Sequence, residues 1–191
     1  MLKFIVLGTS QFTLSCIDGV IDEGHEVSKV ISMPSECLPE NSVDVRDFCL
    51  SRNIDYFETE DINKDECVAM LKSIAPDCIL STWPKIISKS VLEVPKRLTI
   101  GTHPSSLPMN QGRHPLHWMI VLGLSNTLLS FFAMDEGIDT GNILYHVPFS
   151  ISNRSITHAD SDMCSAGYQG TRDLHQLFES NSIYKGVKQT K

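Results

Sequence analysis

Long apolar runs are missing from this sequence of 191 residues. A helix that crosses a bilayer needs a run of about 18 or more apolar residues, and none is present. The N-terminus, MLKFIVLGTSQF, has one lysine and a short apolar run that ends in a polar turn, which favours a buried first strand over a signal peptide. The sequence therefore predicts a cytoplasmic protein with no membrane partner.

Clusters of basic residues are also scarce. The chain has 16 Lys and Arg residues against 23 Asp and Glu residues, for a formal net charge of −7, and the acidic residues are scattered. A protein that binds nucleic acid usually carries a basic patch that meets the phosphates. We therefore expect no nucleic-acid partner.

Motifs for metals, nucleophiles and dinucleotides are equally rare. The six cysteines form no CxxC pair, and most lie in an apolar or helical context, where cysteine behaves as a small buried hydrophobe. His114 and His117 have i, i+3 spacing but lack a third ligand, so no metal site is predicted. Neither the GxSxG motif of serine hydrolases nor the GxGxxG motif of dinucleotide-binding folds is present, which argues against both classes.

Alternating strand and helix patterns predict the fold. Residues 2–7 form a short apolar run, Gly8-Thr9-Ser10 marks a turn, and Ser10 can cap a helix that Gly24 ends. A strand at 26–33 then completes a βαβ unit, and a proline-containing loop follows at 34–41. Later strands are expected at 54–57, 78–81, 97–101, 127–133 and 142–149, and later helices at 42–52, 61–74, around 91–92, at 115–122 and from Thr157.

The C-terminal part is predicted to be helical and then to fray. Thr157 and Asp160 have capping-box spacing, Gly167 and Gly170 weaken the helix, and residues 184–191 are polar and basic. With 41% hydrophobic residues, the chain is long enough to form one domain over residues 1–191. The expected fold is α/β and Rossmann-like, a doubly wound, mostly parallel twisted sheet with helices on both faces.

Two polar loops that follow predicted strands carry the candidate catalytic residues. His103 precedes Pro104, which keeps the backbone extended, and its imidazole can donate a proton or a hydrogen bond at neutral pH. Asp139 lies in a glycine-flanked loop between two strands. Open α/β sheets keep their active sites at the carboxyl ends of strands, so the two side chains can meet if their strands are neighbours. A carboxylate there would stabilise the imidazolium, whereas a turn histidine and a turn aspartate are the simpler alternatives.

The order of motifs around these residues resembles a known enzyme family. HPSSLPMNQGRHPLHW followed by MDEGIDTG is similar to the formyltransferases that use 10-formyltetrahydrofolate, whose members carry an HxSxLP turn and a later D-G or DTG aspartate. Upstream, LGTSQFTLSCIDGVIDEGHEV resembles the opening GTxxFxxxxLxxLxxxGHEV of the branch that contains methionyl-tRNA formyltransferases and sugar N-formyltransferases. The resemblance covers roughly residues 1–180, and its paired central motifs are more specific than a single glycine motif.

The resemblance implies roles for individual residues. His103 would match the catalytic histidine that polarises the formyl oxygen, and Asp139 the aspartate that supports it and helps to move protons from the attacking amine. The family usually has Asn-x-His, and Gly101 occupies the asparagine position here. Loss of one oxyanion donor costs on the order of a hundredfold or more in rate, unless Asn110, a water or a backbone N–H substitutes. The implied folate-binding residues are Trp83, Pro84, Lys85, Ile86, Ile87, Met134, Asp135, Glu136, Gly137 and Ile138.

The branch that the chain resembles suggests the acceptor. The loop at 34–41, PSECLPEN, differs from the basic loop of the tRNA branch, whose C-terminal barrel would lie beyond Lys191, and the first turn differs from the glycine-rich phosphate loop of the purine branch. The short sugar N-formyltransferases remain, in which NxGRxP after the LP turn is familiar. These enzymes continue past the position of Lys191, so we expect a domain truncated at its C-terminus. A homodimer is a further expectation. The implied acceptor-binding residues are Ser105, Asn110, Gly112 and Arg113.

These implications combine into one expected activity. The chain would transfer a formyl group from the co-substrate 10-formyltetrahydrofolate to a primary amine on a nucleotide-linked amino sugar. Hydrolysis of the same donor, with water in place of the amine, is one alternative. A catalytically impaired folate-binding module is the other, because Gly101 removes one donor to the oxyanion.

Overall fold

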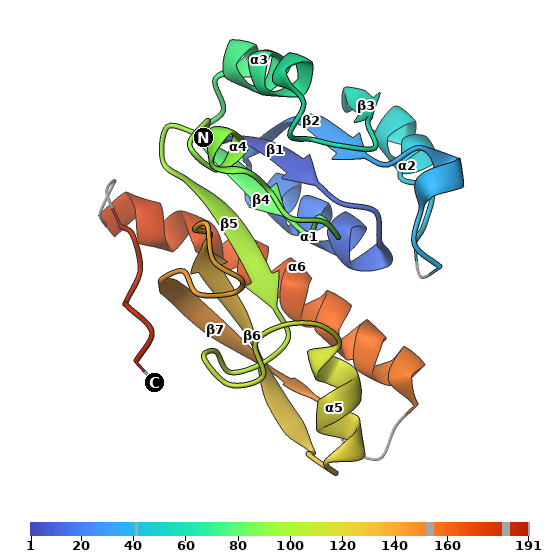
Figure 1. Cartoon of the computed structure of the whole chain (residues 1–191), viewed down its shortest axis with the longest axis vertical. Helices are drawn as coiled ribbons and strands as arrows, with labels where there is room; N and C mark the ends of the chain where they lie inside the picture. Colours follow the sequence, from blue (N-terminus) through green and yellow to red (C-terminus); the bar gives the residue numbers. More distant parts are fainter. Residues whose placement is uncertain (41, 152–154, 181–183, 191) are drawn as a thin grey trace.

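The computed structural model describes residues 1–40, 42–151, 155–180 and 184–190. Asn41, expected in a loop, and Lys191, expected in a fraying end, lie outside the described residues. A seven-stranded sheet with the order β3-β2-β1-β4-β5-β6-β7 forms the centre of the molecule (Figure 1). Its strands are β1 (Lys3–Leu7), β2 (Glu26–Ser32), β3 (Tyr56–Glu58), β4 (Cys78–Ser81), β5 (Leu98–His103), β6 (Asn126–Ala133) and β7 (Ile143–Ser150).

The sheet changes direction at β6. The pairs from β3 to β5 are all parallel, whereas β5–β6 and β6–β7 are antiparallel. The predicted α/β fold with a mostly parallel sheet is therefore confirmed. The change of direction could not be predicted, because an apolar run looks the same in a parallel and an antiparallel strand.

Helices cover both faces of the parallel half of the sheet. In β1, Phe4 and Val6 pack in the core that contains α1 and α6, whereas Ile5 and Leu7 pack in the core that contains α3 and α4. This alternation is what a strand buried on both sides requires. The helices are α1 (Gln11–Asp22), α2 (Arg46–Ser51), α3 (Asp65–Ile74), α4 (Lys89–Leu92), α5 (Pro115–Val121) and α6 (Ile156–Ser180), and a 3-10 turn, η1, spans Ser35–Cys37.

The first helix begins and ends as its sequence predicts. Ser10 and Thr13 form a reciprocal capping box at the start of α1, and Gly24 adopts φ +79° just beyond its end. The helices expected at 42–52 and 61–74 are shorter than predicted. Each begins four residues later, because Asp44 and Asp61 use their side chains to accept backbone N–H groups of local turns.

One prediction about α6 was wrong. Thr157 is not the cap, because the helix already begins at Ile156. Gly167 and Gly170 lie within the continuous helix and allow α6 to lie against its neighbours. A Cβ on Gly167 would lie 2.4 Å from the Phe12 ring, and one on Gly170 would lie 2.3 Å from the Phe131 ring. Glycine here trades helix propensity for close packing.

The C-terminal segment is paired with the sheet and does not fray as predicted. Val187 and Ile143 exchange two backbone hydrogen bonds of 2.7 and 2.8 Å in an antiparallel bridge. The Tyr184 hydroxyl donates to the Leu144 carbonyl at 3.1 Å. The described part of this segment, residues 184–190, therefore lies along the start of β7. Polar composition did not predict this, since backbone groups make the pairing.

The cysteines are free thiols, and most are buried as expected. Burial raises the pKa of Cys49 to about 11 and that of Cys78 to about 12, so these thiols stay protonated at neutral pH. Their contribution is therefore apolar packing in the core. None of the described helices has the length and apolar content needed to cross a bilayer.

The crossing of α1 and α6 gives a stability prediction. A Cβ on Gly19 would lie 2.3 Å from the Tyr168 backbone oxygen, which cannot move aside as a flexible side chain can. We expect Gly19→Ala to lower the free energy of unfolding by about 1–3 kcal/mol in urea denaturation, despite the better helix propensity of alanine. Ser161→Ala, at an exposed position of α6, should change it by less than about 0.5 kcal/mol. Equal stability of wild type and Gly19→Ala would contradict the close helix contact.

Candidate active site

Two loops that start at opposite ends of β5 meet over one face of the sheet. The first follows His103 at the carboxyl end of β5. The second follows Ala133, which pairs with Ile100, so it begins beside the amino half of β5, where the Met134 N–H donates to the Thr99 carbonyl at 2.8 Å. Each loop follows the carboxyl end of its own strand, and β5 and β6 are neighbours, as the prediction required, but their antiparallel pairing separates the two ends. The loops meet because the second loop folds back along the sheet.

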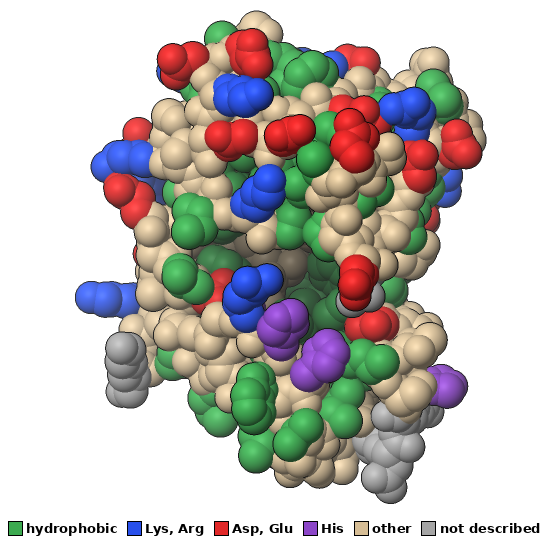
Figure 2. Space-filling view, turned by 45° about the vertical axis from the view of Figure 1, so that its right-hand side comes forward, with side chains coloured by type: hydrophobic (Ala, Val, Ile, Leu, Met, Phe, Trp, Pro, Cys, Tyr) green, Lys and Arg blue, Asp and Glu red, His purple; other side chains and the backbone are tan. Residues whose placement is uncertain are grey.

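The first loop is fastened to this face through a buried serine of β6. Ser130 pairs with His103 across the two strands, and its hydroxyl donates to the Ser105 carbonyl at 2.5 Å and accepts from the Leu107 N–H at 3.2 Å. Figure 2 shows a hollow in the middle of this face of the molecule. Histidine side chains lie at its lower rim in this view, and hydrophobic side chains lie within it and below it. The candidate residues therefore lie on loops, which can change conformation more readily than helices.

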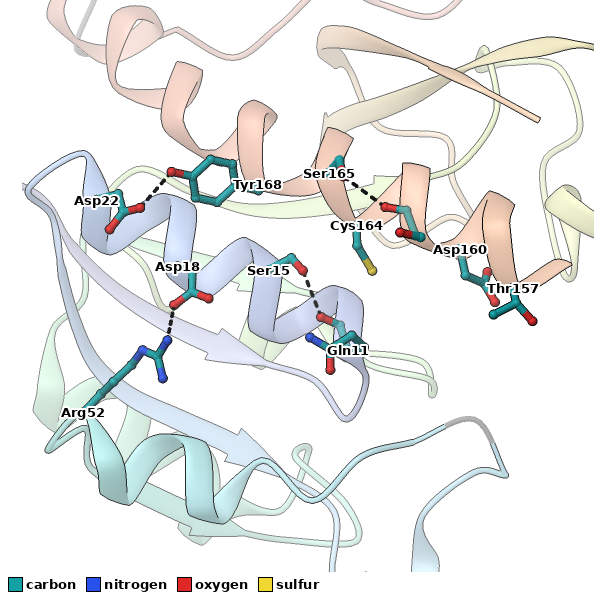
Figure 3. Close-up of a pocket in the computed structure, with 11 residues that line it drawn as sticks. Gln11, Ser15, Asp18, Asp22, Arg52, Thr157, Asp160, Cys164, Ser165 and Tyr168 are labelled. Carbon is teal, nitrogen blue, oxygen red and sulfur yellow. Dashed lines mark hydrogen bonds and ion pairs between the residues drawn. The ribbon is translucent and has the colours of Figure 1, made fainter. Parts of the chain in front are cut away.

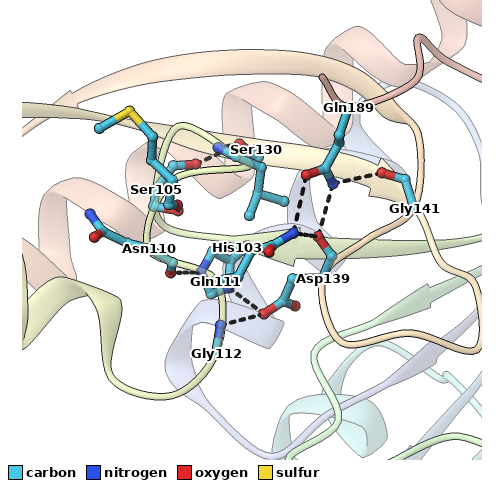
Figure 4. Close-up of polar contacts among 11 residues, drawn as sticks. His103, Ser105, Asn110, Gln111, Gly112, Ser130, Asp139, Gly141 and Gln189 are labelled. Atoms are coloured by element: carbon cyan, nitrogen blue, oxygen red, sulfur yellow. Dashed lines mark hydrogen bonds and ion pairs between the residues drawn. The ribbon is translucent and has the colours of Figure 1, made fainter. Parts of the chain in front are cut away.

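His103 is held by a polar contact on each side of its ring. The side chain is only 7% exposed, and Nε2 lies 2.8 Å from the carbonyl oxygen of Asn110 (Figure 4). Because a carbonyl can only accept, this contact places a proton on Nε2. Nδ1 lies 3.5 Å from Oδ2 of Asp139. The structure thus brings the two predicted catalytic residues together, in the orientation in which a carboxylate supports a positively charged ring.

Asp139 is fixed by contacts to both its side chain and its backbone. Its φ is +54°, in the left-handed region, and Oδ2 accepts the Gly112 N–H at 2.9 Å. Its carbonyl oxygen accepts from the side-chain amides of Gln111 and Gln189, each at 2.8 Å (Figure 4). Sequence reasoning did not identify these two glutamines. No local sequence pattern could identify them, because the contact depends on the folded chain: Gln189 lies 50 residues from Asp139.

The residues expected to bind the acceptor occupy different environments. Ser105 has no exposed surface, and its hydroxyl donates to the Met109 carbonyl at 2.6 Å, so its position supports a role in the turn and not in acceptor contact. Gly112 contributes its N–H to Asp139, as described. Asn110 and Arg113 are exposed at the edge of the first loop. His114 and His117, which begin α5, are also exposed, with ring centroids 5.7 Å apart.

An ion pair links the second segment expected to bind folate to the chain just after the first. Residues 83–87 follow β4, and residues 134–138 begin the second loop. Lys89, just after the first segment, forms an ion pair of 2.9 Å with Glu136 in the second. Ile86 and Ile138 are 76% and 66% exposed, whereas Trp83 and Ile87 are buried. Exposed apolar side chains on adjoining loops form the kind of surface that an aromatic ring system can bind.

Gly101 lies within the sheet, directly between Ser81 of β4 and Phe132 of β6. A Cβ at this position would lie 2.7 Å from the Phe132 ring and 2.8 Å from Cγ of Met134. The space that a longer residue would need is therefore already filled by two apolar side chains.

A groove of about 800 Å³ between α1 and α6 contains none of these residues (Figure 3). Asp18 pairs with Arg52 at 2.9 Å, and Asp22 accepts from the Tyr168 hydroxyl at 2.7 Å, so two of its acidic groups are engaged by the protein. Burial raises the pKa of a third, Asp160. Among the described residues, no group of three or more His, Cys, Asp or Glu side chains is arranged to hold a metal ion.

Comparison with known proteins identifies the family. The family model described as "Formyl transferase" matches residues 2–161, a range that includes His103, Asp139 and both folate segments. The chain belongs to this formyl transferase family. The formyl donor of the family is 10-formyltetrahydrofolate, as the resemblance implied.

The chain is similar to several curated proteins. The methionyl-tRNA formyltransferase of Alkaliphilus oremlandii is 28% identical over 188 residues, which are 95% of this chain and 61% of that protein. The methionyl-tRNA formyltransferase of Clostridium acetobutylicum is 33% identical over 150 residues, which are 75% of this chain and 48% of that protein. The chain thus spans only about half to three fifths of the length of these relatives.

Solved structures show the same fold. The phosphoribosylglycinamide formyltransferase from Anaplasma phagocytophilum superimposes with a TM-score of 0.81 at 16% identity, covering 100% of this chain and 94% of that chain. The methionyl-tRNA formyltransferase from Clostridium thermocellum gives a TM-score of 0.65 at 18% identity, covering 100% of this chain and 70% of that chain. The Rossmann-like α/β fold predicted for this chain is therefore confirmed.

The packing around Gly101 gives a second stability prediction. Gly101→Asn should lower the free energy of unfolding by about 1–3 kcal/mol, because the added side chain displaces Phe132 and Met134. Combining it with Met134→Ala should recover part of the loss, so the two changes would not be additive. Thermal denaturation of both single variants and the double variant measures this coupling. Full additivity would show that Met134 does not fill the space beside Gly101.

Proposed function

We propose that this chain transfers the formyl group of 10-formyltetrahydrofolate to a primary amine. The observation that carries the proposal is the contact of 3.5 Å between His103 and Asp139, within the range that the family model matches. The amine nitrogen attacks the formyl carbon, and a C–N bond forms as negative charge develops on the formyl oxygen. The bond from the carbon to N10 of the folate then breaks, leaving a formamide and tetrahydrofolate.

His103 supplies the hydrogen bond to the developing oxyanion. Its Nε2 proton points at the Asn110 carbonyl oxygen, 2.8 Å away, which occupies the position that a substrate oxygen needs. Asn110 is exposed in a loop, so its carbonyl can give way to the formyl oxygen. A donor aimed at the oxyanion in a largely buried site lowers the barrier, because the donor is already oriented before charge develops.

Asp139 orients His103 and balances the proton transfer. Its carboxylate faces Nδ1, so it stabilises the imidazolium form of the ring when the oxyanion is formed. The attacking amine loses one proton in the reaction, and N10 of the departing folate gains one. With 19% of its side chain exposed, Asp139 can also reach a water that carries this proton.

The folate is placed by the segments 83–87 and 134–138. Ile86 and Ile138 present apolar surface for the pterin ring, while the ion pair between Lys89 and Glu136 holds the two segments together. Polar groups of the ring would meet backbone N–H and C=O groups of the second loop.

The proposed acceptor is the amine of a nucleotide-linked amino sugar. Arg113 supports it, because an exposed guanidinium beside the site can bind a phosphate of the nucleotide. The net charge of −7 disfavours a polyanion such as tRNA. A methionine carried on tRNA is nevertheless a second candidate, favoured by the names of the curated relatives.

Two other functions use the same donor site. Hydrolysis would place water where the amine attacks. A folate-binding module with weak catalysis is favoured by Gly101, where Phe132 and Met134 fill the space in which the family resemblance places an asparagine.

Substitution of the two catalytic residues tests the proposal. His103→Gln and Asp139→Asn should each lower the transfer rate by roughly 10²–10⁴-fold while folate binding is retained, because the changes remove proton transfer and not apolar contact. His158→Gln and Asp47→Asn, at exposed positions of α6 and α2, are matched controls that should stay near the wild-type rate. A wild-type rate in His103→Gln would exclude the proposed role of this ring.

A screen of acceptors tests the substrate class. Mass spectrometry should detect a formylated product when 10-formyltetrahydrofolate is mixed with nucleotide-linked amino sugars. Product only with methionyl-tRNA would overturn the proposed acceptor while retaining formyl transfer. Formate released without any amine would indicate hydrolysis, and calorimetric binding of a folate analogue without turnover would indicate a binding module.

A further inference from the structure

We infer that Gln189 is a positioning residue, which acts with Gln111 to hold Asp139 against His103. It lies beyond the residues that the family model matches, which end at 161. The kinetic part of this inference rests on the proposed function, whereas the geometric part does not.

The amide groups of the two glutamines converge on one backbone atom. The Asp139 carbonyl oxygen accepts Nε2 of Gln111 and Nε2 of Gln189, each at 2.8 Å. Gln189 Nε2 also donates to the Gly141 carbonyl at 2.8 Å, and Gln189 Oε1 accepts from Gln111 Nε2 at 3.2 Å. The turn at Asp139 is thus closed by side chains from two segments that are 78 residues apart in the chain (Figure 4).

This clamp matters because the conformation of Asp139 is unfavourable for its residue type. A φ of +54° is rare for residues other than glycine, although Asp tolerates it better than most. In this conformation the carboxylate faces the Gly112 N–H at 2.9 Å and His103 Nδ1 at 3.5 Å. Rotation of the 139–140 peptide would break both amide contacts, and the turn that presents the carboxylate to the ring would lose this support.

The backbone around Gln189 is itself anchored to the sheet. The bridge between Val187 and Ile143 fixes the chain two residues before Gln189. Gly186 adopts φ +78° and approaches the Ile143 carbonyl so closely that a Cβ would lie 2.5 Å from it. These backbone contacts therefore fix the position from which the Gln189 side chain reaches Asp139. Lys188, between these contacts, has an exposed side chain and provides a matched control.

The first test measures geometry without any substrate. In the full chain, Gln189→Leu removes both amide donors at nearly the same side-chain size. The NMR signal of the His103 ring Cε1–H should move toward its position in Asp139→Asn, and Gln111→Leu should move it in the same direction. Lys188→Ala should leave it at the wild-type position. An unshifted His103 signal in folded Gln189→Leu, with folding checked by circular dichroism, would overturn the inference even if the protein proves inactive.

The second test measures turnover with the amine found in the acceptor screen. Gln189→Leu should lower kcat by roughly ten- to a hundredfold, as expected when a catalytic group is misplaced, while KM for 10-formyltetrahydrofolate changes less than about twofold. The Gln111→Leu/Gln189→Leu double variant should lose less than the product of the single losses, because both amides hold the same carbonyl. A wild-type kcat in Gln189→Leu, or a loss confined to KM, would overturn the inference. Failure of all acceptors would overturn the proposed function and leave the NMR result standing.

Discussion

The antiparallel pairing of β5 with β6 is the constraint on which the arrangement of the site depends. Because β6 runs against β5, the loops that follow His103 and Ala133 leave from opposite ends of one strand pair. The second loop folds back over the sheet, and the two loops meet where Asp139 accepts the Gly112 N–H. If the two strands were parallel, both loops would leave from the same edge, and the carboxylate would approach the imidazole from another direction.

The two faces of the sheet serve different purposes. On one face, α1 and α6 approach so closely that glycines are required at their contacts, and the groove between these helices contains none of the candidate site residues. On the other face, loops lie over Gly101 and His103. Close packing resists changes in volume and shape, whereas loops can exchange one hydrogen-bond partner for another. The molecule thus combines a rigid support with a loop surface, on which the proposed reaction would replace the Asn110 carbonyl by a substrate oxygen.

The sequence predicted most of the elements and the candidate pair, but not how they come together. Strand 78–81 and the turn at Ser10 have local signals, a buried apolar run and an N-cap serine, and both were located correctly. His103 and Asp139 were singled out by their loops and by the family resemblance. The direction of β6, the left-handed conformation of Asp139 and the contacts of Gln189 depend on groups distant in the chain, so no local pattern encodes them. Residues 184–190 were predicted to fray because their side chains are polar, whereas the pairing with β7 is made by backbone groups.

The bridge between Val187 and Ile143 also affects how the sheet meets other molecules. In the described part of the chain, β6 is the one strand that pairs with β7 in the sheet. An edge strand with open N–H and C=O groups is a template for another chain. Here the bridge occupies the edge at Ile143, and Pro148 has no N–H to offer. Between them lie only residues 144–147, fewer than the roughly 5–6 residues of a typical strand. The segment 184–190, which contacts Asp139 through Gln189, therefore also shortens the part of β7 that is open to edge-to-edge aggregation.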